Sequence, residues 1–190
     1  NKETHKMTAL EIARKNVDLE NPNLPMKLKF EVSPKEAIER LLSIEDLTLP
    51  TSNEKTRNII GVIFDKIVEN LDKNHFENMN VVRGNPIASA EDNFDNLFFP
   101  KGNPGRSSTY TRYVDGNNLL RTHVTSLVPE TLRKLRDDGL NEKFYTFVFP
   151  GLAYRRDVID PRHLDVFHQI DVWTIQENQT YGVTDRNDLL

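Results

Sequence analysis

The segment Phe149–Ile175, FPGLAYRRDVIDPRHLDVFHQIDVWTI, constrains the fold of this chain more than any other stretch. It has the pattern of two strands joined by a polar loop. We expect the first strand to end over Tyr154–Asp157. The second should span Val166–Ile175, which is rich in β-branched and aromatic residues. Pro161 prevents a helix in the connecting loop. The segment therefore predicts a β-hairpin.

Side chains alternate between the two faces of a strand, so one face of this hairpin should gather polar and aromatic groups. The residues concerned are Arg155 and Asp157 on the first strand and Phe167, Gln169, Asp171 and Trp173 on the second. A hairpin with only a structural role would have aliphatic side chains on one of its faces. If the two polar faces coincide, the surface offers a guanidinium for a phosphate, a flat ring for a base and acceptors for an ammonium group.

The composition sets broad limits on the class of protein. The chain has 190 residues, of which 37% are hydrophobic and 28% charged, as expected for one globular domain with a core and a small appendage. The formal net charge of −4 argues against RNA binding through a large basic surface. The absence of cysteine excludes disulfides and thiolate zinc sites. We expect no membrane span and no signal peptide, because no apolar run is long enough.

The hairpin resembles motif 2 of the class II aminoacyl-tRNA synthetases, and in particular that of the catalytic chain of the phenylalanyl-tRNA synthetases. The matching residues are Tyr154-Arg155-Arg156-Asp157, His163 and Phe167-His168-Gln169-Ile170-Asp171. Two earlier segments also resemble this family. They are Asn93–Leu97 with Pro100–Arg106, and Leu119–Ser126, which reads LLRTHVTS. The resemblance covers about Ser52–Leu190.

The resemblance implies an α+β fold, with an antiparallel β-sheet flanked by helices as in class II catalytic domains. It implies an enzyme that uses ATP with Mg²⁺ to activate phenylalanine and then ligates phenylalanine to tRNA(Phe). Phenylalanine and tRNA would be its substrates. The setting would be cytoplasmic, with a mitochondrial or plastid matrix as the alternative.

The same resemblance assigns an ATP site. Arg155 would be the catalytic residue, binding the α-phosphate through the parallel donors of its permanently charged guanidinium. Asp157 would help to position ATP, and His163 on the loop would reach the terminal phosphates. Phe167 would stack on the adenine.

The amino-acid site follows in the same way. Gln169 and Asp171 would hold the amino group of the substrate. His123 and Thr125 would meet its amino and carboxylate groups, with Ser126 as the alternative to Thr125. Asp171 is one methylene shorter than the glutamate usual in the family, which leaves the identity of the amino acid open.

Purely structural roles compete with these assignments. Arg155 could form an ion pair with Asp157 or Asp171, Phe167 could be a core residue, and 122–126 could cap the next helix. The histidines and carboxylates His123, His163, His168, Asp157 and Asp171 lack the spacing of a zinc site, so we expect no dedicated metal site.

The N-terminal half is expected to divide at residue 50. Residues 1–50 would be an appendage with one capped helix, Pro34–Ile44, which begins in a capping box. A helix from Ser52 or Asn53 to about Asn74 would follow. Its apolar stripe consists of Ile59, Ile60, Ile63, Ile67, Val68 and Leu71. This helix and a strand at Met79–Arg83 resemble motif 1, which implies a homodimer or association with a second synthetase chain.

Residues 51–190 would then be a partial catalytic domain. We expect a strand at Ser107–Val114, a turn at Asp115-Gly116 and a returning strand to His123. A helix at Pro129–Asp138 and a strand at Phe144–Phe149 come next, with a turn or bulge at Pro150-Gly151. A short strand at 181–183 and a helix from 185 would end the chain.

Motifs 1 and 2 are present in this region but no motif 3 follows, so the sequence predicts a fold that is incomplete at the C-terminus. It is either a fragment or a relative without that half. Three other readings remain open from the residues. They are a non-catalytic synthetase-like protein that binds an amino acid, a nucleotide or a partner chain, a class II enzyme of different amino-acid specificity, and a structural chain.

Overall fold

The computed structural model describes residues 33–51, 56–73, 79–139, 142, 144–157 and 159–176. The chain divides into two compact units, Asn1–Pro34 and Lys35–Leu190. Nearly all of the described residues belong to the second unit. The strand and helix expected beyond residue 180 lie outside the described residues. Among the helices that are described, none has the length and apolar character needed to cross a membrane.

Two long antiparallel strands, β4 (Phe144–Tyr154) and β5 (Val166–Gln176), form the centre of the unit. Their register is continuous, with Phe144 opposite Gln176 and Tyr154 opposite Val166. The short strand β1 (Met79–Val81) pairs in parallel with the other edge of β4. The hairpin predicted from the sequence is therefore confirmed. Its first strand, β4, is the central strand of the sheet and is almost entirely buried, which fits its aromatic and aliphatic content.

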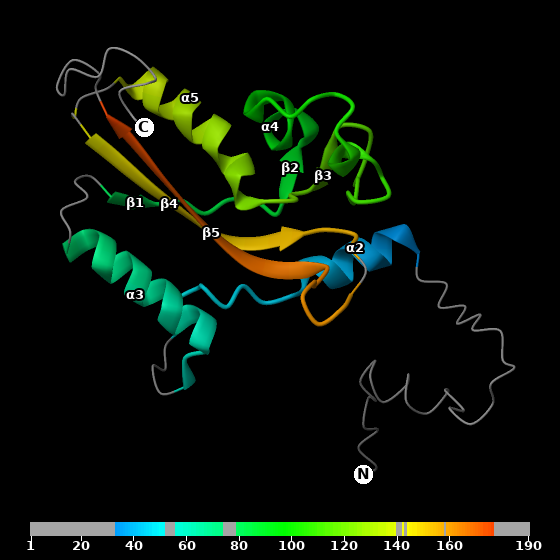
Figure 1. Cartoon of the computed structure of the whole chain (residues 1–190), viewed down its shortest axis with the longest axis horizontal. Coiled ribbons are helices and arrows are strands. Elements are labelled where there is room, and N and C mark those ends of the chain that lie inside the picture. Colours follow the sequence, from blue (N-terminus) through cyan, green and yellow to red (C-terminus); the bar gives the residue numbers. More distant parts are fainter. Residues whose placement is uncertain are drawn as a thin grey trace, which may run out of the picture. The chain divides into compact units, whose positions relative to one another are not determined.

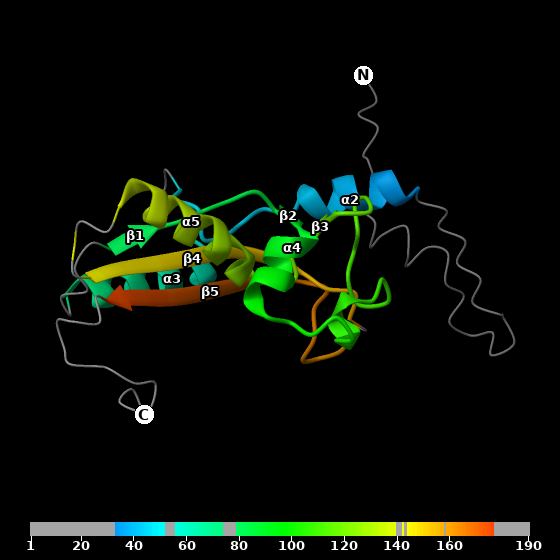
Figure 2. The ribbon, with the colours of Figure 1, turned by 90° about the horizontal axis from the view of Figure 1, so that it is seen from above.

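Helices cover both faces of this sheet (Figures 1 and 2). On one face, α5 (Val128–Asp138) and the 3₁₀ turn η4 (Val124–Leu127) pack on the aromatic side chains of β4. The buried members of that cluster are Val124, Leu127, Val128, Phe147 and Phe149.

On the other face lie α2 (Pro34–Leu42) and α3 (Ile59–Lys73). Ile38 and Leu41 of α2 pack on the buried Leu120, Leu152 and Tyr154. The contacts of α2 therefore reach residues far beyond residue 50. A domain division at residue 50 stays a prediction.

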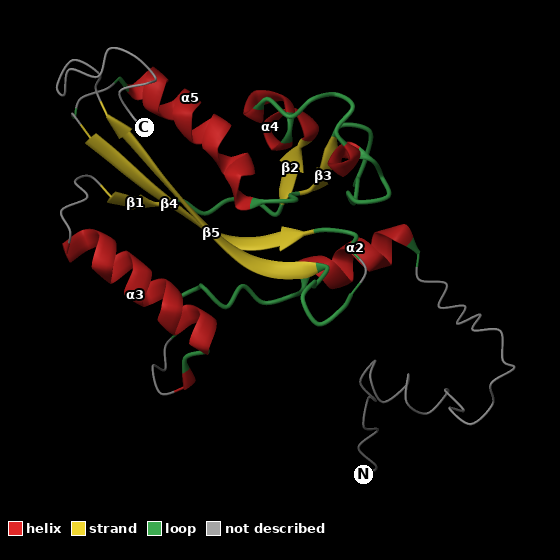
Figure 3. Cartoon of the chain, viewed as in Figure 1, coloured by secondary structure: helices red, strands yellow, loops and turns green. Residues whose placement is uncertain are grey.

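A second, two-stranded sheet lies beside the central one, and α4 and the turns that follow it are attached to this second sheet (Figure 3). Strand β2 (Ile87–Ser89) pairs antiparallel with β3 (Asn118–Leu120). Ser89 also caps the short helix α4 (Ala90–Asn93), since its side chain accepts a hydrogen bond from the Asp92 amide. Two 3₁₀ turns follow, η2 (Asp95–Leu97) and η3 (Pro104–Arg106).

Helix α5 begins one residue before the predicted Pro129 and ends at Asp138, as expected. Gly139 follows with a φ of 82°, a conformation that favours glycine and ends the helix. Helix α2 also agrees with the expected Pro34–Ile44 to within two residues.

The strand expected at Ser107–Val114 is wrong. This segment forms turns, because the Ser107 carbonyl accepts hydrogen bonds from the amides of Tyr110 and Thr111 at 3.0 and 2.9 Å. Ser107 also accepts from the Thr109 amide through its hydroxyl. Such local side-chain bonds favour turns over strands. Strand β3 pairs with β2 instead.

The turn or bulge expected at Pro150-Gly151 is also wrong, since β4 is unbroken from Phe144 to Tyr154. Val148 and Tyr154 direct their backbone bonds away from β5, toward Val82 and Arg121. Pro150 lies an even number of residues from both, so its nitrogen also faces the β1 side of β4. Strand β1 pairs only with Thr146–Val148 and does not reach Pro150. A proline is tolerated at such a position because no ladder bond is lost.

Strand β4 ends three residues earlier than expected, so Arg155–Asp157 lie beyond it. Helix α3 begins at Ile59, and its first turn is capped by Asn58, whose side chain accepts from the Ile60 amide at 2.9 Å. Residues 57 and 58 are not helical, so α3 does not extend before Ile59 in the described residues, and the expected starts at Ser52 or Asn53 lie outside them. The buried residues of α3 are Gly61 and Phe64. Of its predicted apolar stripe, Ile59 and Ile63 are exposed and the other four residues are half-buried.

Candidate functional site

Arg155 is the first residue after β4, and its side chain is held from two sides. Its Nε donates a hydrogen bond to the Thr122 carbonyl at 3.0 Å. Its Cζ lies 5.1 Å from the centroid of the Phe167 ring, within the range of a cation–π contact. Among the described residues no carboxylate forms an ion pair with this guanidinium, and neither terminal nitrogen has a hydrogen-bond partner. The ion pairs with Asp157 or Asp171, considered as a structural role, are therefore not formed.

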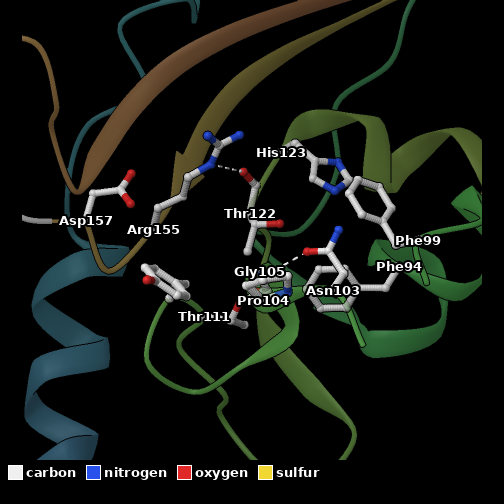
Figure 4. Close-up of a pocket in the computed structure, with 11 residues that line it drawn as sticks. Phe94, Phe99, Asn103, Pro104, Gly105, Thr111, Thr122, His123, Arg155 and Asp157 are labelled. Carbon is white, nitrogen blue, oxygen red and sulfur yellow. Dashed lines mark hydrogen bonds between the residues drawn. The ribbon is translucent and has the colours of Figure 1, made fainter. Parts of the chain in front are cut away.

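A cavity of about 370 Å³ opens beside Arg155 (Figure 4). Arg155 and Asp157 line one side of it, and Phe94, Phe99 and Asn103 line the other. The cavity thus lies between a free guanidinium and a carboxylate, which follow β4, and the loop that follows α4.

His123 closes this cavity with a ring that is 8% exposed. The ring stacks on Phe99, with 5.5 Å between centroids and 14° between planes. Neither ring nitrogen has a hydrogen-bond partner among the described residues. Burial lowers the pKa of His123 to about 4, so the imidazole is neutral at pH 7 and has one donor and one acceptor available. Buried polar atoms are rarely left unpaired, which points to a ligand at this position.

Strand β5 and the turn η4 meet through two polar side chains of β5. Gln169 accepts a hydrogen bond from the Val124 amide at 3.2 Å. Asp171 accepts from the Thr125 hydroxyl at 2.6 Å and from the indole of Trp173 at 3.1 Å, both through Oδ2. The Oδ1 atom makes no hydrogen bond with the described residues and remains available to an ammonium group.

A second cavity of about 510 Å³ lies on the other side of His123 and Arg155. Both residues also line the first cavity, so the two spaces are neighbours. Thr125 and Trp173 contribute to its wall. The rest of its lining is largely apolar and includes Leu97, Phe98, Phe99, Val128, Pro129 and Leu132. This space offers an apolar volume beside Asp171 and next to the guanidinium.

The structure brings most of the predicted site residues together. Arg155, Asp157, His123 and Thr125 line the two cavities. Phe167 lies under the Arg155 guanidinium, and Gln169 and Asp171 bond to the η4 turn that carries Thr125, although these three line neither cavity. Phe167 is also among the residues that line a separate apolar cavity against α3.

Two predicted residues are placed elsewhere. His163 is exposed and pairs with Asp160 at 2.9 Å, a hydrogen bond that raises the pKa of His163. It lines neither cavity. Ser126 is buried, and its hydroxyl contacts neither cavity nor any described polar partner. Of the two alternatives, Thr125 is thus the one that reaches Asp171.

The capping role considered for residues 122–126 is not formed. The next helix, α5, has Leu127 at its N-cap and no side-chain capping hydrogen bond. His123, at the N-cap of η4, makes none either. The described residues contain no group of three or more histidine, aspartate or glutamate side chains placed to hold a metal ion.

Sequence reasoning gave no role to Thr122 or Asn93, although both belong to segments it singled out. Thr122 supplies the carbonyl that holds Arg155, and Asn93 is fully buried against Thr122. An asparagine is rarely buried without a partner, but the sequence carries no signal for which partner.

Comparison with known proteins gives matches over the same region. The family model described as tRNA synthetases class II core domain (F) matches residues 45–185. A mitochondrial phenylalanine–tRNA ligase of Saccharomyces cerevisiae is 33% identical over 150 residues, or 78% of this chain and 31% of that protein. A phenylalanine–tRNA ligase alpha subunit of Enterococcus faecalis is 29% identical over 77% of this chain and 42% of its own length.

A solved structure shares the fold. The pyrrolysyl-tRNA synthetase of Desulfitobacterium hafniense superposes with a TM-score of 0.50 at 16% identity, over 73% of this chain and 43% of that one. The present chain spans less than half the length of each of these three proteins.

Proposed function

This chain belongs to the family of class II tRNA synthetase core domains, and from that premise we propose that it is the nucleotide- and amino-acid-binding part of a phenylalanine–tRNA ligase. Both curated relatives described above are phenylalanine–tRNA ligases. The observation that carries the proposal is the free guanidinium of Arg155 at two neighbouring cavities, together with the unpartnered ring of His123, which lines both.

The first step would be attack of a carboxylate oxygen of phenylalanine on the α-phosphorus of ATP. An oxygen–phosphorus bond forms, the bond to the bridging oxygen breaks, and pyrophosphate leaves. This reaction needs positioning and charge stabilisation rather than a protein nucleophile. The Arg155 guanidinium would bind the α-phosphate oxygens, since its terminal nitrogens have no partner among the described residues. Phenylalanine would then pass from the adenylate to the tRNA.

The substrate amino group would bind at Asp171 and Gln169. Thr125 and Trp173 both donate to Asp171 Oδ2, which fixes the carboxylate while Oδ1 stays available. The apolar cavity beside it would take the phenyl ring. A neutral His123 could donate to the substrate carboxylate, because its low pKa keeps it uncharged at pH 7.

ATP would lie in the cavity of about 370 Å³ and across Arg155, with Asp157 near its amine end and Phe167 near the adenine. Mg²⁺ would arrive with the phosphates and neutralise their charge. His163 would need a movement of its loop to reach them, because it now pairs with Asp160.

Helix α3 is the proposed contact for a second chain or a second copy. Ile59 and Ile63 are 66% and 50% exposed, and apolar side chains of this kind are often covered by a partner. The setting would be the cytoplasm, or the mitochondrial matrix as in the yeast relative.

Calorimetric titration with non-hydrolysable aminoacyl-sulfamoyl-adenosines tests the proposal. The phenylalanyl compound should bind more tightly than the tyrosyl and leucyl compounds, which differ only in the side chain. Failure of the folded protein to bind any of the three would overturn the synthetase assignment. A preference for another side chain would overturn only the amino acid.

A further inference from the structure

Asn93, the last residue of α4, is completely buried and makes a two-point contact with one neighbour. Its Nδ2 donates to the Thr122 hydroxyl at 2.9 Å, and its Oδ1 accepts from the Thr122 amide at 3.0 Å. One amide therefore fixes both the side chain and the backbone of Thr122. No other side chain in the described residues forms a hydrogen bond with the Thr122 amide.

Thr122 passes this constraint to Arg155. Its carbonyl accepts the Arg155 Nε–H at 3.0 Å, which is the hydrogen bond that the guanidinium makes within the described residues (Figure 4). A bond at Nε restrains the orientation of the planar group and leaves both terminal nitrogens without a partner among the described residues. Without it, the long side chain would have to lose rotamer freedom when a phosphate binds.

The position of Asn93 is itself fixed. Asp92 makes two hydrogen bonds with Arg133 of α5, at 2.9 and 2.8 Å, which join α4 to α5. Phe94 on the other side is 2% exposed, and the Arg106 guanidinium lies 4.8 Å above its ring. A side chain between two anchored neighbours can act as a rigid support, as preorganised sites require.

We propose that Asn93 is a positioning residue, which holds the Arg155 guanidinium in its phosphate-binding orientation through the backbone of Thr122. The proposal rests on the proposed function for the role of Arg155, but the link from Asn93 to Arg155 is a property of the chain without any ligand.

A double-mutant cycle tests the link in binding. Asn93→Ala should weaken phenylalanyl-sulfamoyl-adenosine binding at least fivefold in the wild-type background. In an Arg155→Lys background, which has no Nε–H at this place, the same change should cost less than twofold. Coupling of this kind distinguishes action through Arg155 from a general effect on packing. Equal losses in the two backgrounds would overturn the proposal.

The ligand-free protein gives an independent readout. The Nε–H signal of Arg155, assigned by its loss in Arg155→Lys, should exchange with water at least tenfold faster in Asn93→Ala. Asn117→Ala is the matched control, because Asn117 is exposed and lies in a turn. An unchanged Arg155 signal in folded Asn93→Ala would overturn the positioning role.

Thr122→Val keeps the test valid if Asn93→Ala does not fold. Valine removes only the hydroxyl that accepts from Asn93 Nδ2 and retains the shape of the side chain. We expect the same direction of change in the Arg155 signal, with a smaller size. Failure of the wild-type chain to bind the analogue, with the exchange effect present, would count against the proposed function and in favour of the positioning link.

Discussion

The Thr125 hydroxyl donates a 2.6 Å hydrogen bond to Asp171, across the boundary between η4 and β5. These residues are 46 positions apart in the chain, and this bond joins the two segments that the family resemblance assigned to the amino-acid site. The bond holds a carboxylate that is one methylene shorter than the family's usual glutamate.

Thr125→Val should weaken phenylalanine binding about tenfold, or about 1.4 kcal/mol, because a hydrogen bond to a charged group is lost and Asp171 keeps only the bond from the Trp173 indole. ATP binding should change less than twofold. Calorimetric titration of each ligand measures both effects. The control is Thr131→Val on α5. The Thr131 hydroxyl donates to the Leu127 carbonyl of η4 and has no other hydrogen bond with the described residues. Equal losses for the two ligands would show that Thr125 has no specific role at the amino-acid end.

His123 should make the protein less stable as the pH falls from 7.5 to 5. Its pKa is lowered by burial to about 4 in the folded state, whereas an unfolded histidine titrates near 6.5. Below pH 6.5 the unfolded chain binds a proton that the folded chain does not, so stability is lost as the pH falls toward 4. The loss between pH 7.5 and 5 should be about 2 kcal/mol.

Urea denaturation of the wild type and of His123→Gln over this pH range measures the effect. Between pH 7.5 and 5, the free energy of unfolding of His123→Gln should fall by about 2 kcal/mol less than that of the wild type. His163→Gln is the control, and its effect should have the opposite sign, because the pKa of His163 is raised by Asp160 and pairing is lost as the pH rises. A slope unchanged in His123→Gln would mean that His123 is not buried in solution.

Gly151→Ala should destabilise the fold by about 3 kcal/mol, because the backbone φ of 152° strains an alanine and its Cβ would lie 2.3 Å from Arg121 Nη2. Arg121 cannot move easily, since it is 3% exposed and donates to the carbonyls of Leu152 and Gly84. Gly102→Ala is the control, with open space around its Cβ and an expected change within about 0.5 kcal/mol. The urea denaturation midpoints of the two variants measure the difference. Equal stability of Gly151→Ala and Gly102→Ala would refute the requirement for glycine beside Arg121.

The sequence predicted the hairpin and α5 because their signals are local. Alternating β-branched and aromatic residues define β5, and Pro129 and Gly139 mark the ends of α5. The Ser107–Val114 segment has the composition of a strand, but its described pairing is limited to an isolated bridge between Tyr113 and Leu119, and the Ser107 bonds favour turns. Likewise, nothing local indicates that the nitrogen of Pro150 faces an edge without a ladder.

Of the nine site residues predicted from the motifs, four line the two cavities, and Phe167, Gln169 and Asp171 contact the segments that form their walls. His163 lies apart because the position of a loop depends on its own contacts, here with Asp160, and its role stays a prediction. Asn93 was missed because its role depends on a contact 29 positions away, with Thr122, which no pattern in a single sequence reveals.

The most direct test of the central claim compares two adjacent arginines in one titration. Arg155 faces the cavities, whereas the Arg156 guanidinium donates to the Ser108 carbonyl. Arg155→Ala should weaken phenylalanyl-sulfamoyl-adenosine binding by about 30-fold or more, as expected for the loss of charge-assisted hydrogen bonds. Arg156→Ala should change it less than twofold. Equal weakening by the two variants, or none by Arg155→Ala, would contradict the phosphate-binding role of Arg155.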